Sequence, residues 1–151
     1  MSGGLYVLVL DLCQGTIVTP GALPAAHAPA GRYLYVGSAR RALEARVRRH
    51  RSRTKKLHWH IDYFTTLEAC TVVDVVTLTD APYAECDLCR SRYDGLDGEA
   101  PVPGFGATDC RAECPAHLMR VPTAVGHEAV TSAAAGVASA RHACHDRPDS
   151  P

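Results

Sequence analysis

The sequence has no apolar run that approaches the roughly 20 residues needed to span a bilayer. The apolar stretch at residues 5–10 is too short for a signal peptide, and no basic residue precedes it. The seven cysteines are an odd number, and without a secretion signal they favour thiols or metal ligands over a disulfide framework. We therefore expect a cytoplasmic protein, and 151 residues suit one domain with a sizeable core.

The chain also lacks net charge, with 16 basic and 16 acidic residues. This balance conceals a local asymmetry, because residues 40–56 hold nine of the 16 Lys and Arg residues and one acid, Glu44. A concentrated positive field attracts polyanions, of which nucleic acid is the commonest. A solvated helix face without a ligand is the alternative interpretation of the same pattern.

Residues 33–56 predict an apolar strand, a tight turn at Gly37-Ser38 and a basic helix with Ser38 as its N-cap. On the strand, Tyr33 and Tyr35 face the same way, because successive side chains of a strand alternate between its faces.

The predicted helix buries a stripe formed by Leu43 and Val47, and Arg46 falls at the border between the buried and solvent-facing sides. Arg46, Arg49 and His50 lie on adjoining turns, so they could serve one site. The side chains expected to face solvent are Arg41, Glu44, Arg48 and Arg51.

Apolar and β-branched runs predict the remaining elements. Strands are expected at residues 4–10, 32–36, 70–78 and 117–121, and helices at residues 57–67 and 81–93. The first two strands should pair antiparallel and bring Tyr6 and Tyr35 towards a shared surface. Residues 122–151 contain no leucine or aromatic residue, so we expect a mobile tail after a domain of residues 1–121.

Three motifs occur in order: G-L-Y at residues 4–6, Y-V-G at residues 35–37, and Arg46 nine residues after that glycine. Together with K-K-L-H-W-H-I-D-Y at residues 55–63 and G-F-G-A-T-D-C at residues 104–110, this order resembles the GIY-YIG nuclease superfamily. The closest resemblance is to a small, free-standing, prokaryotic-type subfamily. It implies an α+β fold, in which helices flank a small, mostly antiparallel, three-stranded sheet with the active site on one face.

The resemblance also implies a metal-dependent endonuclease that hydrolyses phosphodiester bonds in nucleic acid, with DNA expected and Mg²⁺ or Mn²⁺ as the ion. By position, Tyr6 would be the general base or a relay that orients water, and Tyr35 would position the water and bind phosphate. Arg46 would stabilise the charge that grows on the phosphoryl oxygens. A glutamate would hold the metal; Glu85, on the helix after the third strand, is our choice, and Glu68 is the alternative.

Three histidines are candidates for proton transfer or phosphate contact: His50, His58 and His60. His58 and Asp62 are four residues apart, so on a helix the carboxylate could orient that imidazole. The side chains expected to contact nucleic acid are Arg40, Arg48, Arg49, Arg51, Arg53, Lys55 and Lys56.

Four cysteines have a number and spacing that suit tetrahedral zinc: Cys86, Cys89, Cys110 and Cys114. The first two also suit small core residues on one face of a helix. The second hypothesis, of a different class, is a non-catalytic nucleic-acid-binding module, with or without a stabilising zinc ion.

Overall fold

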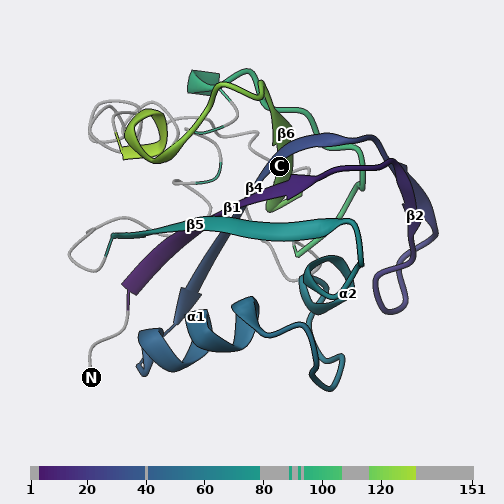
Figure 1. The fold of residues 1–151 in the computed structure, drawn as a ribbon, viewed down its shortest axis with the longest axis horizontal. Helices are drawn as coiled ribbons and strands as arrows, with labels where there is room; N and C mark the ends of the chain where they lie inside the picture. The colour runs from purple at the N-terminus through teal and green to yellow at the C-terminus, as the bar shows by residue number, and fades with distance from the viewer. Residues whose placement is uncertain are drawn as a thin grey trace, which may run out of the picture.

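The computed structural model describes residues 4–39, 41–78, 89, 92, 94–106 and 116–131. Its main element is a four-stranded antiparallel sheet with the strand order β5-β1-β4-β6 (Figure 1). The strands are β1 (Gly4–Leu12), β4 (Gly31–Ala39), β5 (Cys70–Leu78) and β6 (Leu118–Val121). The α+β class is confirmed, and the sheet has a fourth strand because β6 pairs with the first half of β4.

The pairing of β1 with β4 brings the two candidate tyrosines to the same face of the sheet. Tyr6 lies opposite Gly37, and Leu8 lies opposite Tyr35. Since Gly37 and Ser38 continue this ladder as far as Ala39, the predicted turn at Gly37-Ser38 is wrong. Their backbone groups pair with β1 and are not free to start a helix.

Two helices follow β4 along the chain. Helix α1 (Leu43–Arg51) begins after Ala42, whose φ of 56° is left-handed, and no side chain caps it, so Ser38 is not its N-cap. Helix α2 (Asp62–Thr65) is much shorter than the predicted helix of residues 57–67. The reason is that the Asp62 carboxylate accepts hydrogen bonds from the backbone N–H groups of His58 and Trp59, which holds that segment in a turn.

One face of the sheet is covered by α1 and α2 (Figure 1). Tyr6, Leu8 and Leu10 pack there against Leu43 and Phe64. As the alternation of a strand requires, the intervening residues of β1 face the other side.

The opposite face has a core of its own, in which Val7 and Val36 pack with Val125 and Val130. The C-terminal helical turn of residues 127–131 lies on this side, across the sheet from α1 (Figure 1). Val125 and Val130, which lie beyond the predicted boundary at Val121, are buried on this face.

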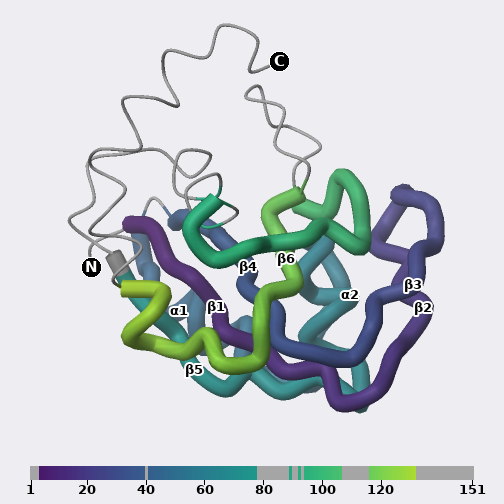
Figure 2. Tube along the Cα trace, turned by 90° about the horizontal axis from the view of Figure 1, so that it is seen from above, coloured from purple at the N-terminus to yellow at the C-terminus, as the bar shows by residue number. Residues whose placement is uncertain are grey.

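A small hairpin of β2 (Thr16–Val18) and β3 (Ala26–Ala28) lies at the end of the sheet away from α1 (Figure 2). Of the predicted helix at residues 81–93, Cys89 and Arg92 are described, and both are helical. Over the described residues, no helix combines the length and the apolar character needed to cross a membrane.

Candidate active site

The Tyr6 hydroxyl lies 2.7 Å from Nε2 of His50. Tyr6 stands near the start of β1 and His50 on the last turn of α1, so the fold brings together two residues 44 positions apart. Both are almost fully enclosed, with 1% of Tyr6 and 2% of His50 exposed. The two side chains therefore form a buried pair suited to holding or moving a proton.

Tyr35 lies on the same face and is half-buried. Its ring meets those of His50 and Phe105 edge-on, with 6.2 Å between centroids in each case. Gly106, with a φ of 70°, approaches so closely that a Cβ there would lie 3.2 Å from Cε1 of Tyr35. Its N–H donates to Nδ1 of His60 at 2.8 Å, so His60 anchors the loop that covers Tyr35.

Arg46 is half-buried, at the border of α1 where the sequence places it. Its Nη1 donates to the carbonyl oxygen of Ser38 at 3.1 Å. Its guanidinium carbon lies 4.5 Å from the centroid of the Trp59 ring, within the range of a cation–π contact. Trp59 in turn meets His50 edge-on at 6.3 Å, which links Arg46 to the Tyr6–His50 pair.

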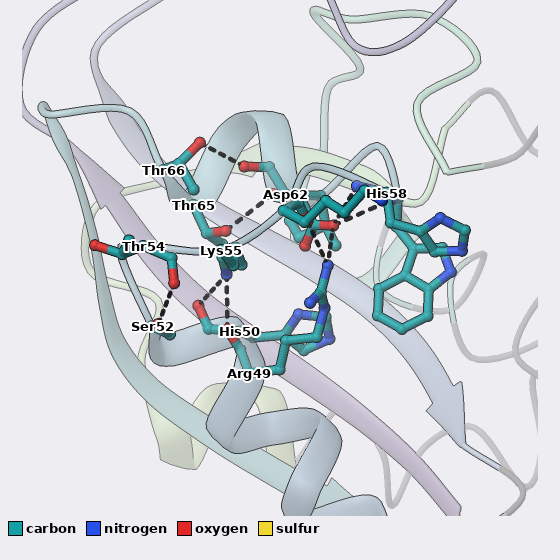
Figure 3. A network of polar contacts seen from close by, with 12 residues as sticks. Arg49, His50, Ser52, Thr54, Lys55, His58, Asp62, Thr65 and Thr66 are labelled. Carbon is teal, nitrogen blue, oxygen red and sulfur yellow. Dashed lines mark hydrogen bonds and ion pairs between the residues drawn. The ribbon is translucent and has the colours of Figure 1, made fainter.

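Asp62 is the anchor of the segment between the helices (Figure 3). Its fully buried carboxylate accepts Nη2 of Arg49 at 2.6 Å and the backbone N–H groups of His58 and Trp59 at 2.8 and 2.9 Å. Burial alone would raise the pKa of Asp62, but these hydrogen bonds outweigh it and hold the pKa below its usual value. Asp62 therefore stays ionised and balances the charge of Arg49.

The environment of His50 disfavours its charged form. Burial, reinforced by the positive charges of Lys55, Arg46 and Arg49, lowers the pKa of His50 to about 4, although Asp62 acts in the opposite direction. The imidazole is therefore neutral at neutral pH.

The remaining predicted nucleic-acid contacts fall into two groups. Arg48, Arg51 and Lys56 are exposed, and none of their side chains makes a hydrogen bond or ion pair within the described parts of the chain. By contrast, Arg53 donates to the carbonyl oxygens of Leu67 and Cys70. Lys55 donates to the carbonyl oxygens of Arg49 and His50 at the end of α1, at 2.8 and 3.1 Å. Arg40 lies outside the described residues.

His58 does not adopt the predicted arrangement. Asp62 binds its backbone N–H and not its imidazole, because residue 58 precedes α2 and is not part of a helix. The exposed His58 ring lies against Trp59 instead, with 5.1 Å between centroids.

Most of the expected metal ligands fall outside the described residues. Within residues 4–39, 41–78, 89, 92, 94–106 and 116–131, no three His, Cys, Asp or Glu side chains gather where they could hold an ion. Glu85, Cys86, Cys110 and Cys114 lie outside these residues. Cys89 is buried, and its Sγ hydrogen-bonds the carbonyl oxygen of Ala116 at 3.2 Å.

The alternative metal ligand, Glu68, lies at the far end of the sheet. It precedes β5, whose first residue Cys70 pairs with Leu12, whereas Tyr6 pairs with Thr77. Leu12 lies six positions after Tyr6 on β1, roughly 20 Å at the usual rise. One ion cannot contact both Glu68 and a phosphate beside Tyr6.

Residues 5–139 match the family model described as a domain of unknown function, DUF123. The chain belongs to this family. Neither the curated proteins nor the solved structures gave a match. The DUF123 match spans every candidate residue described above and continues past Val121, in agreement with the burial of Val125 and Val130.

Two residues of this DUF123 site were not assigned their roles from the sequence. In the sequence, Trp59 is one letter of the K-K-L-H-W-H-I-D-Y motif, and the spacing of Asp62 suggests a partner for the His58 imidazole. The available signal was composition: the one tryptophan of the chain stands in a segment that follows a run of arginines. Aromatic faces attract such cations, but the sequence does not say which arginine comes near.

Proposed function

We propose that this protein is a metal-dependent endonuclease that hydrolyses phosphodiester bonds in nucleic acid, with DNA as the expected substrate. The observation that carries the proposal is the buried 2.7 Å contact between Tyr6 and His50, with Arg46 linked to it through Trp59. This set unites a proton-handling pair and a cation, the two kinds of group that phosphodiester hydrolysis uses.

The electrostatics of the site favour an anionic ligand. Three cations lower the pKa of His50: Lys55, Arg46 and Arg49. Their positive charges therefore act on the same small region. Among the described residues, Arg49 is the one of the three that forms an ion pair with a carboxylate, that of Asp62. A phosphodiester is negative and its transition state more so, and a preorganised guanidinium at Arg46 stabilises the transition state selectively.

In the proposed reaction, an attacking water forms the new P–O bond and gives its proton to Tyr6, while the P–O bond to the leaving sugar oxygen breaks and that oxygen takes up a proton from solvent. Tyr6 passes its phenolic proton to Nε2 of His50, in the tautomer that carries a proton on Nδ1. The negative phosphate favours the resulting imidazolium, which the free protein disfavours. Only 1% of Tyr6 is exposed to solvent in the free protein. The step therefore requires that the attacking water reaches the Tyr6 hydroxyl when the substrate is bound.

The resemblance to GIY-YIG nucleases implies one divalent ion, which would polarise the phosphoryl oxygens when bound. Two described carboxylates do not fit that role, since Asp62 is occupied by Arg49 and Glu68 lies far from Tyr6. Glu85, the expected ligand, lies outside the described residues. The ion is therefore part of the proposal through the resemblance alone.

The second candidate function is a nucleic-acid-binding module without turnover. The near-complete burial of Tyr6 and His50 favours it, because buried polar pairs also occur as packing elements. The exposed basic side chains Arg48, Arg51 and Lys56 would serve this function equally well.

A nicking assay separates the two functions. Supercoiled plasmid and branched, flapped and single-stranded oligonucleotides are incubated with the protein and Mg²⁺, Mn²⁺ or EDTA. We expect metal-dependent cutting that falls by about 10²–10³-fold in Arg46→Ala, the usual scale for losing one transition-state donor. Arg41→Ala, which removes an exposed arginine outside the site, is the matched control and should cut like wild type. Salt-sensitive binding without cutting would favour the second candidate.

A further inference from the structure

Trp59 contacts both arginines of the candidate site from the segment that joins α1 to α2. The guanidinium carbon of Arg46 lies 4.5 Å from the ring centroid, and that of Arg49 lies 4.9 Å from it. Both distances are inside the limit of about 6 Å at which an aromatic ring attracts a cation. The indole therefore gathers two positive groups that would otherwise repel each other.

The two arginines differ in how their charge is balanced. Arg49 forms an ion pair with Asp62 at 2.6 Å. Arg46 contacts neutral groups, the Ser38 carbonyl at 3.1 Å and the indole of Trp59, and no carboxylate in the described part of the chain pairs with it. An arginine held by a carbonyl and a ring keeps its charge for an incoming anion, whereas a carboxylate partner would compete with that anion.

Asp62 fixes the backbone that carries the indole. Its Oδ2 accepts the N–H groups of His58 and Trp59 as well as Arg49, and its side chain is 0% exposed (Figure 3). A charged acceptor at this position makes stronger hydrogen bonds than a neutral one. The position of the indole is therefore set by a buried anion only three residues along the chain.

We propose that Trp59 is a positioning residue, which holds the Arg46 guanidinium towards the substrate phosphate, and that Asp62 keeps Trp59 in place. The inference rests on the proposed function, in which Arg46 contacts that phosphate. A donor fixed before the reaction stabilises the transition state better than a mobile one, because no reorganisation is needed when the charge develops. Trp59 thus acts through Arg46 and not on the substrate.

The first test requires no catalysis. The Nε–Hε resonance of Arg46, assigned by its loss in Arg46→Ala, is recorded by ¹H–¹⁵N NMR in wild type, Trp59→Phe and Trp59→Leu. We expect the ring current of Trp59 to shift the wild-type resonance, Trp59→Phe to keep part of the shift, and Trp59→Leu to lose it. Leu57→Ala, at an exposed position of the same segment, should leave the resonance in place. An Arg46 resonance that stays the same in Trp59→Leu overturns the inference.

The second test is a double-mutant cycle on cleavage with Arg46→Ala, Trp59→Leu and the double variant. Loss of a partly desolvated cation–π contact should lower kcat by about 3- to 30-fold in Trp59→Leu, with KM nearly constant and a smaller loss in Trp59→Phe. In the Arg46→Ala background, replacing Trp59 should have no further effect. If the losses of kcat in Arg46→Ala and Trp59→Leu multiply in the double variant, Trp59 does not act through Arg46.

The two tests separate failure of the inference from failure of the proposed function. If the wild-type protein cuts no nucleic acid, the proposed function fails, and the NMR comparison still decides whether Trp59 positions Arg46. If Trp59→Leu does not fold, Trp59→Phe replaces it in both tests, since the smaller ring keeps most of the volume and a weaker attraction for cations.

Discussion

The Tyr6 ring occupies the space in which a side chain at Gly37 would lie. The two residues are opposite each other in the pairing of β1 with β4, and a Cβ at residue 37 would be 2.5 Å from both Cζ and Oη of Tyr6. Tyr6 cannot move aside without cost, because it is buried and its hydroxyl contacts His50. Gly37 of the Y-V-G motif therefore leaves room for Tyr6 of the G-L-Y motif.

Gly37→Ala should displace Tyr6 from His50. We expect the free energy of unfolding to fall by about 1–3 kcal/mol, the usual cost of overpacking a core. Nuclease turnover should fall as well, since the proton-handling pair is separated. Urea unfolding and the nicking assay measure the two effects.

Gly126→Ala is the matched control for that substitution, because a Cβ at residue 126 meets no described atom within 4 Å. It should change stability and turnover little. A Gly37→Ala variant as stable and as active as Gly126→Ala would contradict the close approach of Tyr6 to the β4 backbone.

The depressed pKa of His50 predicts a loss of stability in mild acid. The unfolded chain takes up a proton at His50 below its ordinary pKa of 6.5, whereas the folded protein does so only near 4. Stability is therefore fully present above pH 6.5 and declines as the pH falls towards 4. A shift of this size corresponds to about 3 kcal/mol, measurable by urea unfolding at a series of pH values.

His50→Gln tests the source of that pH dependence. Glutamine can still accept a hydrogen bond from Tyr6, but it does not titrate. The decline between pH 6.5 and 4 should flatten in this variant. A wild-type pH profile in His50→Gln would assign the dependence to other groups.

Asp62→Asn should loosen the segment between α1 and α2. The substitution keeps the shape of the side chain but leaves the partly buried Arg49 without its counter-charge. Because 30% of the Arg49 side chain is exposed and solvent screens it, we expect a loss of about 2 kcal/mol and not the full cost of breaking a buried pair. The emission of Trp59, the one tryptophan of the chain, should also shift to longer wavelength.

Asp74→Asn is the control, since Asp74 pairs with His127 at the surface, where both side chains are at least 40% exposed. This pair should contribute about 0.5 kcal/mol or less. If Asp62→Asn and Asp74→Asn lower the free energy of unfolding equally, the buried network around Asp62 stabilises the protein no more than a surface ion pair does.

The exposed arginines of α1 should control nucleic-acid affinity. Replacing Arg48 and Arg51 by alanine should weaken binding and reduce the slope of log K against log salt by about 2, if each contacts one phosphate. Arg53→Ala should lower stability more than affinity, because its guanidinium donates to the Leu67 and Cys70 carbonyls. Fluorescence anisotropy over a range of NaCl concentrations measures the slopes, and equal slopes in wild type and the double variant would remove Arg48 and Arg51 from the interface.

The periodicity of the sequence predicted the strands and the faces of α1. Strand β5 spans Cys70–Leu78 as expected, and Leu43 is buried while Arg48 and Arg51 are exposed. The period-two pattern also placed Tyr33 and Tyr35 on one face of β4. These features depend on residues within a few positions of one another, so the sequence contains them directly.

Boundaries and loops were predicted less well. Gly37 and Ser38 have the composition of a turn, yet they extend β4 because β1 offers them a partner. Residues 122–131 contain no leucine or aromatic residue, yet Val125 and Val130 are buried against the second face of the sheet. In both cases a partner far along the chain outweighed the local preference.

Sequence alone determined the class of fold, the amphipathic basic helix and the residue types of the candidate site: two tyrosines, Arg46 and a histidine. Only the tertiary structure decided that His50 contacts Tyr6, that Asp62 binds Arg49, and that Trp59 lies against Arg46. The physical reason is that the loop joining the helices takes its shape from a buried carboxylate. The donors that the Asp62 carboxylate binds are selected by burial and by distance in the folded protein, and spacing along the chain determines neither.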